Sequence, residues 1–158
     1  MTETRWLDDV ERAFWWRFVV ARSSVIADVE AALKADAGIG FEDYEVLVHL
    51  SAAADHRLLM SDLAKHMVHS RNRVTQRIDR MVARGLVRRE QCPDDGRCAF
   101  AVMTDEGFAL IESAAPDHVR AVREHLIDRL EPDHLRSGIE IFDRILPPWA
   151  TSDPPPAG

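Results

Sequence analysis

The chain has 158 residues, 46% of them hydrophobic, and a net charge of −7, which suits one compact domain with its own core. No apolar run approaches the roughly 20 residues of a membrane span, and the amino terminus lacks the apolar segment of a secretory signal, so we expect a cytoplasmic protein that does not bind membranes. The two cysteines, Cys92 and Cys98, are too few for a disulfide scaffold and have no zinc-binding spacing, so we expect reduced thiols and no metal or other cofactor.

The first predicted element is one long helix from about Trp6 to Lys34. Apolar residues recur there in steps of three and four, the spacing of a helix face. They are Leu7, Val10, Phe14, Phe18, Ala21, Val25, Val29 and Ala32, with Trp15, Val19, Ile26 and Leu33 on a second face. One small domain cannot bury both apolar faces of such a long helix. A long core helix and a subunit interface are both compatible with this pattern, and the exposed apolar surface favours the interface.

A break at residues 37–40, which contain two glycines, ends this helix. A second helix is predicted over 42–52, with acidic residues in its first turn, where the helix dipole favours them. Three apolar residues at 58–60 fit a short strand.

A helix-turn-helix is predicted in the middle of the chain. Ser61 is placed as the N-cap of a brief helix over 62–67. Ser70 is placed as the N-cap of a second helix over 71–84, which Gly85 ends. Two helices joined by a tight turn, the second rich in arginine, are typical of this motif.

Basic residues are concentrated around the motif. Residues 56–97 hold ten Lys and Arg against five Asp and Glu, whereas the rest of the chain holds ten against twenty-two. A basic segment between acidic flanks is typical of a nucleic-acid-binding module on a scaffold that does not contact phosphate.

The helix 71–84 has one apolar and one polar side. The apolar side carries Val74, Ile78 and Met81. The polar side offers amides, which bond adenine, and arginines, which bond guanine. A solvated charged face is the alternative, but Asp79 is the single acid available to these arginines, so their repulsion is costly unless an anion binds. The predicted DNA contacts from this segment are Ser70, Arg71, Asn72, Arg73, Thr75, Gln76, Arg77 and Arg80.

A β-hairpin is predicted directly after this helix, with strands at 86–90 and 98–103 and a turn at 92–96. A hairpin in this position is the wing of a winged helix. Arg97 is predicted to enter an adjacent minor groove, where narrow A·T tracts attract arginine. Asp95 is repelled by phosphate, so we expect it to hold an arginine or the turn backbone in place.

Three stretches match the pattern of a known family. Asp95-Gly96-Arg97, with Met103-Thr104 and Glu106-Gly107 behind it, has the form of a D-x-R wing followed by L-T-x-x-G, with Met for the usual Leu. Residues 81–89 (MVARGLVRR) have the form L-x-x-x-G-L-V/I-x-R, and residues 43–47 (DYEVL) fit the second helix. Over about residues 6–146 the chain thus resembles the MarR family of winged helix-turn-helix transcriptional regulators.

This resemblance implies a homodimeric DNA-binding regulator, often a repressor. Many such regulators are released from DNA by small aromatic ligands, and some by thiol oxidation. The resemblance places base contact around Asn72, Arg73 and Gln76, minor-groove contact at Arg97, and the bracing role at Asp95.

Two further helices are predicted after the wing. One starts after Thr104, continues to about Leu130 and is expected to kink at Pro116. The last covers 133–146. The predicted fold is mostly α with a small β-hairpin wing, a winged helix-turn-helix whose N- and C-terminal helices form a homodimer interface.

The predicted regions follow from these elements. Residues 5–35 and 105–147 form a helical dimerisation region, residues 42–104 the DNA-binding region, and residues 148–158 a loose, proline-rich tail. A two-fold dimer sets two recognition helices about one turn of DNA apart, so we expect a near-palindromic operator with half-sites roughly 10 bp apart.

The sequence defines an effector site poorly. A cavity between the arm helices and the DNA-binding region has five aromatic candidates: Trp15, Trp16, Phe18, Phe41 and Tyr44. Core packing is the alternative use of these residues and is favoured. A redox-responsive repressor acting through Cys92 and Cys98 is a further alternative, although only Arg89 and Arg97 lie near enough in sequence to favour a thiolate. Surface positions are favoured for the histidines over a metal site.

Two functional classes compete with DNA binding. The chain carries no phosphate-binding loop, nucleophile elbow or H-E-x-x-H motif, so catalysis is not predicted. A winged helix that binds protein is the alternative, and the unpaired arginines favour DNA over it. We therefore predict a sequence-specific regulator that binds double-stranded DNA as a homodimer, represses, and is released by a small aromatic ligand.

Overall fold

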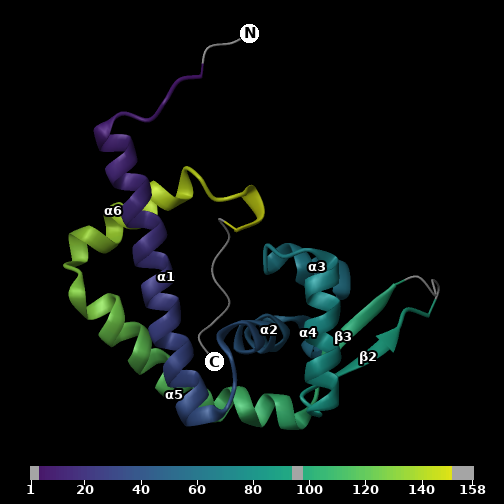
Figure 1. Cartoon of the computed structure of the whole chain (residues 1–158). Helices are drawn as coiled ribbons and strands as arrows, with labels where there is room; N and C mark the ends of the chain where they lie inside the picture. Colours follow the sequence, from purple (N-terminus) through teal and green to yellow (C-terminus); the bar gives the residue numbers. More distant parts are fainter. Residues whose placement is uncertain (1–3, 94–97, 151–158) are drawn as a thin grey trace.

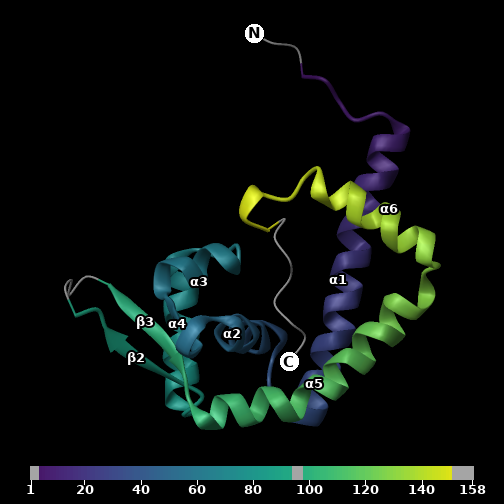
Figure 2. The same cartoon turned by 180° about the vertical axis from the view of Figure 1, so that it is seen from behind.

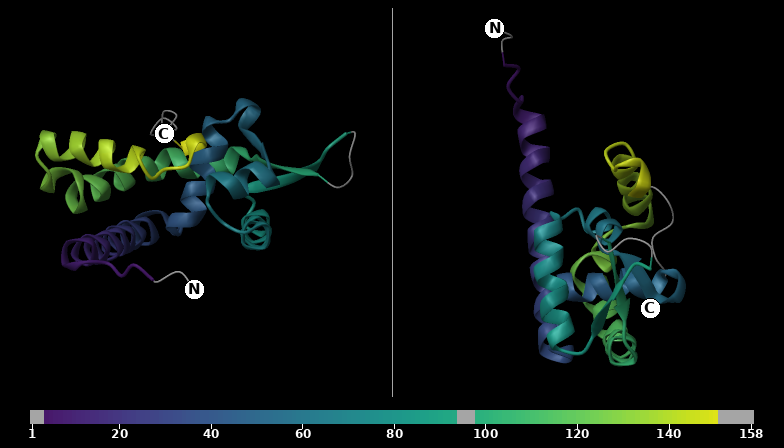
Figure 3. Two further views of the ribbon diagram at one scale, coloured as in Figure 1. Left: turned by 90° about the horizontal axis from the view of Figure 1, so that it is seen from above. Right: turned by 90° about the vertical axis from the view of Figure 1, so that its right-hand side faces the viewer.

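The computed structural model describes residues 4–93 and 98–150. These residues form two regions joined by a long helix (Figure 1). The arm consists of α1 (Asp9–Ala37), the second half of α5 (Asp105–His125) and α6 (Pro132–Asp143). The lobe consists of three helices and a small sheet, and the first half of α5 runs beneath it (Figures 1 and 2). Strands β2 and β3 extend outward from the lobe, away from the arm (Figure 3).

The lobe is a winged helix-turn-helix. Its elements are α2 (Phe41–Ala52), the 3-10 turn Ala54–His56, β1 (Arg57–Leu59), α3 (Met60–His66), α4 (Arg71–Ala83), β2 (Val87–Gln91) and β3 (Ala99–Met103). The antiparallel sheet has the order β1-β3-β2, with Leu59 opposite Phe100 and Val87 opposite Met103. The fold therefore confirms the predicted mostly helical class with a small β wing.

The start of α3 differs from the prediction. The helix begins at Met60 with Leu59 as its N-cap residue, so Ser61 lies in the first turn and is not the cap. The strand explains the difference, because Leu59 is still paired with Phe100 when the helix begins. No linker remains in which Ser61 could serve as a cap.

α1 is capped at both ends, but few of its interior residues are buried. The Asp8 side chain accepts hydrogen bonds from the Val10 and Glu11 amides, and the Glu11 side chain accepts one from the Asp8 amide, which is a capping box. Gly38, in the left-handed conformation with φ 62°, ends the helix. Between these ends only Val29 and Leu33 are buried. The other apolar residues of the two predicted faces are exposed or only partly buried.

α5 connects the two regions. It runs beneath the lobe and then turns upward along α1 (Figures 1 and 2). Pro116 lies inside this helix without ending it. The helix stops at His125, and a 3-10 turn at Ile127–Arg129 precedes α6, so the prediction of one helix to residue 130 was too long.

The chain returns to the lobe after α6. Residues Pro148–Ala150 form a 3-10 turn, and the rings of Trp149 and His66 on α3 meet edge to face with centroids 5.7 Å apart. The first residues of the predicted loose tail are thus placed against the lobe. Residues 151–158 of that tail lie outside the described residues.

Candidate nucleic-acid interface

The outward face of α4 collects most of the predicted DNA contacts. Val74, Ile78 and Met81 are buried in the lobe, as their spacing predicted, and they fix the opposite face toward solvent. The exposed residues of the predicted set are Ser70, Arg71, Asn72, Arg73, Thr75, Gln76 and Arg80. Ser70 caps the helix, its hydroxyl oxygen accepting from the Arg73 amide at 3.4 Å. The face presents amides, hydroxyls and cations together, which are the groups that contact bases and phosphates.

Arg77 differs from the rest of the predicted set. Its guanidinium is turned toward α2, where it pairs with Glu42 and with Asp43. Its side chain is 17% exposed, against 62% for Arg73. Arg73 reaches the same Glu42 with Nη2 3.4 Å from Oε1. Sequence reasoning assigned the acids of α2 to the helix dipole and gave no signal of this pairing across helices.

Burial affects the ionisation of this cluster. It raises the pKa of the Asp43 carboxyl, although the Arg84 and Arg80 guanidinium groups nearby lower it. Burial also lowers the pKa of Arg77, with Arg80 acting in the same direction and Glu30 against it. Charges held in a partly dry site interact more strongly than exposed ones, so removal of one partner is costly.

Strand β2 is tied to α4 by Arg89. Its Nη2 lies 2.9 Å from Oδ1 of Asp79 and donates to the Thr75 carbonyl at 3.1 Å. The single acid on α4 is therefore paired with the wing, and the neighbouring arginines of α4 are not neutralised by it. The bond also fixes the angle between the recognition helix and the base of the wing.

The wing is joined to α5 at one compact junction. The Thr104 hydroxyl donates to the Gly85 carbonyl at 2.7 Å and accepts from the Gly107 amide at 3.0 Å. A Cβ atom on Gly107 would lie 2.2 Å from the Leu86 carbonyl oxygen, so only glycine fits there. Thr104 was predicted as a helix cap, and its second bond could not be foreseen because it depends on how closely α5 approaches the end of α4.

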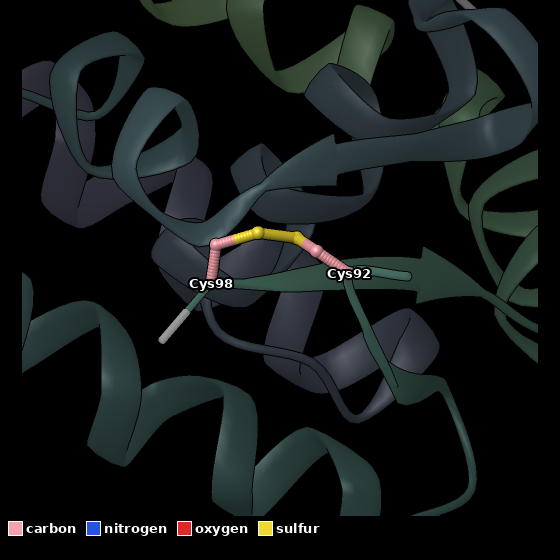
Figure 4. Close-up of a disulfide and its surroundings, with 2 residues drawn as sticks. All are labelled: Cys92 and Cys98. Atoms are coloured by element: carbon pink, nitrogen blue, oxygen red, sulfur yellow. A yellow bond between two sulfur atoms is a disulfide. The ribbon is translucent and has the colours of Figure 1, made fainter. Parts of the chain in front are cut away.

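A disulfide joins the two strands of the wing at their outer ends, directly after β2 and before β3. Cys92 and Cys98 are bonded through their sulfur atoms with Cα atoms 5.6 Å apart (Figure 4). The Cys92 amide also donates to the Cys98 carbonyl at 3.3 Å. The expectation of reduced thiols is thus wrong for this structure, because the hairpin brings the two cysteines opposite each other. The predicted tip contacts Asp95 and Arg97 lie outside the described residues.

The five aromatic candidates for an effector pocket fall into two groups. In the arm, Trp16 lines a shallow hollow on α1, while the Phe18 ring lies 6.1 Å from both Trp15 and Phe142. In the lobe, Tyr44 is buried and its ring centroid lies 4.5 Å from that of His118. Phe41, also in the lobe, packs at the edge of the core. A shared cavity remains a prediction.

The described part of the chain contains neither a metal-binding cluster nor a membrane span. Among residues 4–93 and 98–150, no three His, Cys, Asp or Glu side chains are grouped so that they could hold a metal ion. Within the same residues, no helix combines the length and apolarity needed to cross a bilayer.

Together, the helix pair α3 and α4, the exposed polar face of α4 and the strand pair β2 and β3 define a winged helix-turn-helix protein. A family model described as MarR family matches residues 37–97. The structure of AbsC, a MarR family transcriptional regulator from Streptomyces coelicolor, is 38% identical and superposes with a TM-score of 0.83, covering 90% of this chain and 95% of AbsC. The chain belongs to the MarR family of transcriptional regulators, which are not enzymes.

Two further relatives extend this comparison. Sco3205, a MarR family transcriptional regulator from Streptomyces coelicolor solved in complex with DNA, is 37% identical with a TM-score of 0.86, covering 90% of this chain and 89% of Sco3205. The HTH-type transcriptional repressor YetL of Bacillus subtilis is 28% identical over 111 residues. That match spans 68% of this chain and 66% of YetL.

Proposed function

We propose that this protein is a sequence-specific transcriptional regulator that inserts α4 into the major groove of double-stranded DNA. The exposed face of α4 carries this proposal, since seven predicted contact residues lie there opposite three buried apolar ones. The wing reaches the adjacent minor groove, with Arg97 as its contact. The complex of its relative Sco3205 with DNA supports the same use of this fold.

The regulator acts as a homodimer through the arm. Large apolar side chains are exposed along the first half of α1, along α6 and just after α6. They include Val10, Phe14, Trp15, Trp16, Ile139, Phe142 and Ile145. Apolar surface of this extent, gathered on two helices of one region, is typical of a subunit interface. A two-fold axis there sets two α4 helices on one face of the duplex, so the operator is a near-palindrome with half-sites about 10 bp apart.

Repression and release by a small aromatic effector complete the proposal. Similarity to the transcriptional repressor YetL supports the first. The Tyr44 ring of α2, whose centroid lies 4.5 Å from that of His118 on α5, supports the second. An effector that fixes the arm relative to the lobe changes the distance between the two α4 helices and weakens operator binding.

The experiment uses the full chain and duplex fragments from the intergenic DNA beside its own gene. We expect a mass of two chains in light scattering, and a footprint over a near-palindrome. Affinity should fall linearly with log[salt], with a slope of about 0.9 per phosphate contact. A protein that stays monomeric and binds no DNA fragment at low ionic strength contradicts the proposal. An affinity that barely changes with salt concentration indicates a protein partner instead. Titration of aromatic acids into the complex tests release.

A redox-responsive regulator is the second candidate, and the disulfide between Cys92 and Cys98 favours it. Reduction by a dithiol breaks the S–S bond, transfers two electrons and two protons to the cysteines, and oxidises the dithiol to its own disulfide. The open hairpin then holds its tip less firmly. Operator affinity should differ by about 5-fold or more between the oxidised and reduced protein, and Cys92→Ser with Cys98→Ser should abolish the difference. If the oxidised and reduced proteins bind the operator with equal affinity, the disulfide has a structural role only.

A further inference from the structure

The side chain of Arg77 points away from the surface that α4 offers to DNA. It leaves α4 toward the first turn of α2 and pairs there with both Glu42 and Asp43. The carboxyl-bearing side chain of Asp43 is 15% exposed. A guanidinium held between two carboxylates in a half-dry site has its donors directed inward and few left for a phosphate.

The contact extends along one edge of α4. Arg84, just after the helix, places Nη1 3.6 Å from Oδ2 of Asp43, and its Nη2 donates to the Gly38 carbonyl at 3.1 Å. At the other end, Arg73 reaches Glu42 at 3.4 Å. Residues 73, 77 and 84 fall within about 40° of one another around a helix of 3.6 residues per turn. The acids of α2 thus hold one edge of α4 from its first turn to its end.

Such an edge controls the rotation of α4 about its own axis. The helix is anchored to the core by a narrow stripe of three buried side chains, and a narrow stripe permits rotation more readily than a broad one. A second line of contacts on the flank removes this freedom. The rotation decides whether Asn72 and Gln76 face the base edges or the backbone, and bidentate recognition of a base tolerates little angular error.

We propose that Arg77 is a positioning residue, clamped by Glu42 and Asp43, that sets the rotation of the recognition helix and does not itself contact DNA. The proposal rests on the proposed DNA-binding function. It replaces the prediction, drawn from the helix pattern, that Arg77 is one of the DNA contacts. It also explains why Glu42 and Asp43 lie close to a surface that binds DNA, although their negative charges repel phosphate.

The two roles of Arg77 predict opposite effects of removing the acids. If Arg77 is clamped, the double variant Glu42→Gln, Asp43→Asn binds operator DNA about 10-fold more weakly although it has lost two negative charges. If Arg77 contacts DNA, the same change frees a cation and removes repulsion, so binding becomes tighter. The matched control is Glu112→Gln with Glu124→Gln, two exposed carboxylates on α5, which changes the charge equally and should leave affinity unchanged or slightly higher.

A salt titration separates Arg77 from a true phosphate contact. Arg77→Met should weaken operator binding while the slope against log[salt] stays that of the wild type. Arg80→Met, which truncates an exposed arginine of the same helix, should lower the slope by about 0.9. A slope lowered equally by both variants overturns the proposal. The triple variant Glu42→Gln, Asp43→Asn, Arg77→Met has no unpaired charge left in the buried site. It should therefore bind operator DNA no more weakly than the double variant Glu42→Gln, Asp43→Asn.

A readout without DNA distinguishes this proposal from the function on which it rests. Amide hydrogen exchange along α4 should be faster in Arg77→Met than in Arg80→Met, because the clamp restrains the helix in the free protein. Equal exchange in the two variants overturns the clamp even if DNA binds. If the wild type binds no duplex but α4 exchanges faster in Arg77→Met, the proposed function fails and the clamp stands.

Discussion

Apolar side chains are used differently in the lobe and in the arm. In the lobe they meet one another, so that Leu47, Leu50 and Ile78 have no exposed surface. In the arm they project into solvent, as the 56% exposure of Phe14 shows. The lobe has a core of its own, whereas the arm is completed by a second copy in the proposed homodimer. Stability of the lobe should therefore be a property of one chain, and stability of the arm should depend on concentration.

The largest expected effect lies in the lobe core. Leu50→Ala removes a fully buried side chain and should lower the free energy of unfolding by about 2–5 kcal/mol. The loss should be the same at low and high protein concentration. Ile145→Ala, at an exposed position of the arm, should cost far less in dilute protein. Denaturant unfolding at two concentrations measures both, and equal costs at the two positions would remove the distinction between lobe and arm.

A glycine in each region gives the next comparison. Gly107→Ala forces a Cβ atom into the Leu86 carbonyl and should destabilise by roughly 1–3 kcal/mol. A Cβ atom added to Gly138 in α6 would meet no other segment of the described chain within 4 Å. Gly138→Ala should therefore stabilise the helix by about 0.5–1 kcal/mol. Thermal unfolding checks the two signs, and a stable Gly107→Ala would show that α5 can move away from the wing.

Shortening an exposed apolar side chain of the arm should weaken the homodimer. Phe14→Ala should raise the dimer dissociation constant about 10-fold, as expected for an aromatic side chain in an interface. The control is Phe108→Ala, an exposed phenylalanine on the part of α5 that lies under the lobe. Analytical ultracentrifugation over a concentration series measures both variants. An unchanged constant for Phe14→Ala would move the interface elsewhere on the molecule.

The smallest predicted effect is a pH dependence from His118, where α5 packs against Tyr44 of the lobe. Burial lowers the pKa of His118 below 6.5, and its Nδ1 is buried without a hydrogen-bond partner among the described residues. Well above pH 6.5 the ring is neutral in both the folded and the unfolded chain. As the pH falls below this value the unfolded chain binds the proton first, so stability decreases.

His118→Leu should reduce this loss by up to about 1 kcal/mol between pH 7.5 and 5.5. Tyr44→Phe keeps the aromatic ring beside His118 and should retain the wild-type dependence. Unfolding at the two pH values tests the pair. His49 and His69, whose pKa values are also lowered by burial, supply the dependence that remains in the His118 variant.

Much of the lobe was accessible from the sequence. The inward face of α4 was predicted because Val74, Ile78 and Met81 recur at helical spacing, and the wing because turn residues separate two apolar runs. The start of α3 was missed, since pairing of Leu59 with Phe100 is a contact between distant residues. The disulfide was missed because its formation depends on the register of the hairpin that brings Cys92 opposite Cys98.

The predicted DNA surface shows where such reasoning ends. The helical periodicity placed Arg73, Arg77 and Arg80 together among the predicted DNA contacts, since it treats every residue of a face alike. The structure turns the Arg77 side chain inward because α2 brings Glu42 and Asp43 to that point of the helix, whereas Arg73 also reaches Glu42 but stays exposed. Nothing in the local sequence of α4 carries that information.

The amino-acid sequence by itself determined the order of helices and strands, the inward stripe of each, the basic middle of the chain and its family. Local periodicity and capping depend on neighbours within a few residues, so the chain carries them directly. Only the tertiary structure decided three features. They are the orientation of individual arginine side chains, the disulfide between Cys92 and Cys98, and the close contact of Gly107 with the Leu86 carbonyl. Each of these depends on the approach of segments that folding alone brings together.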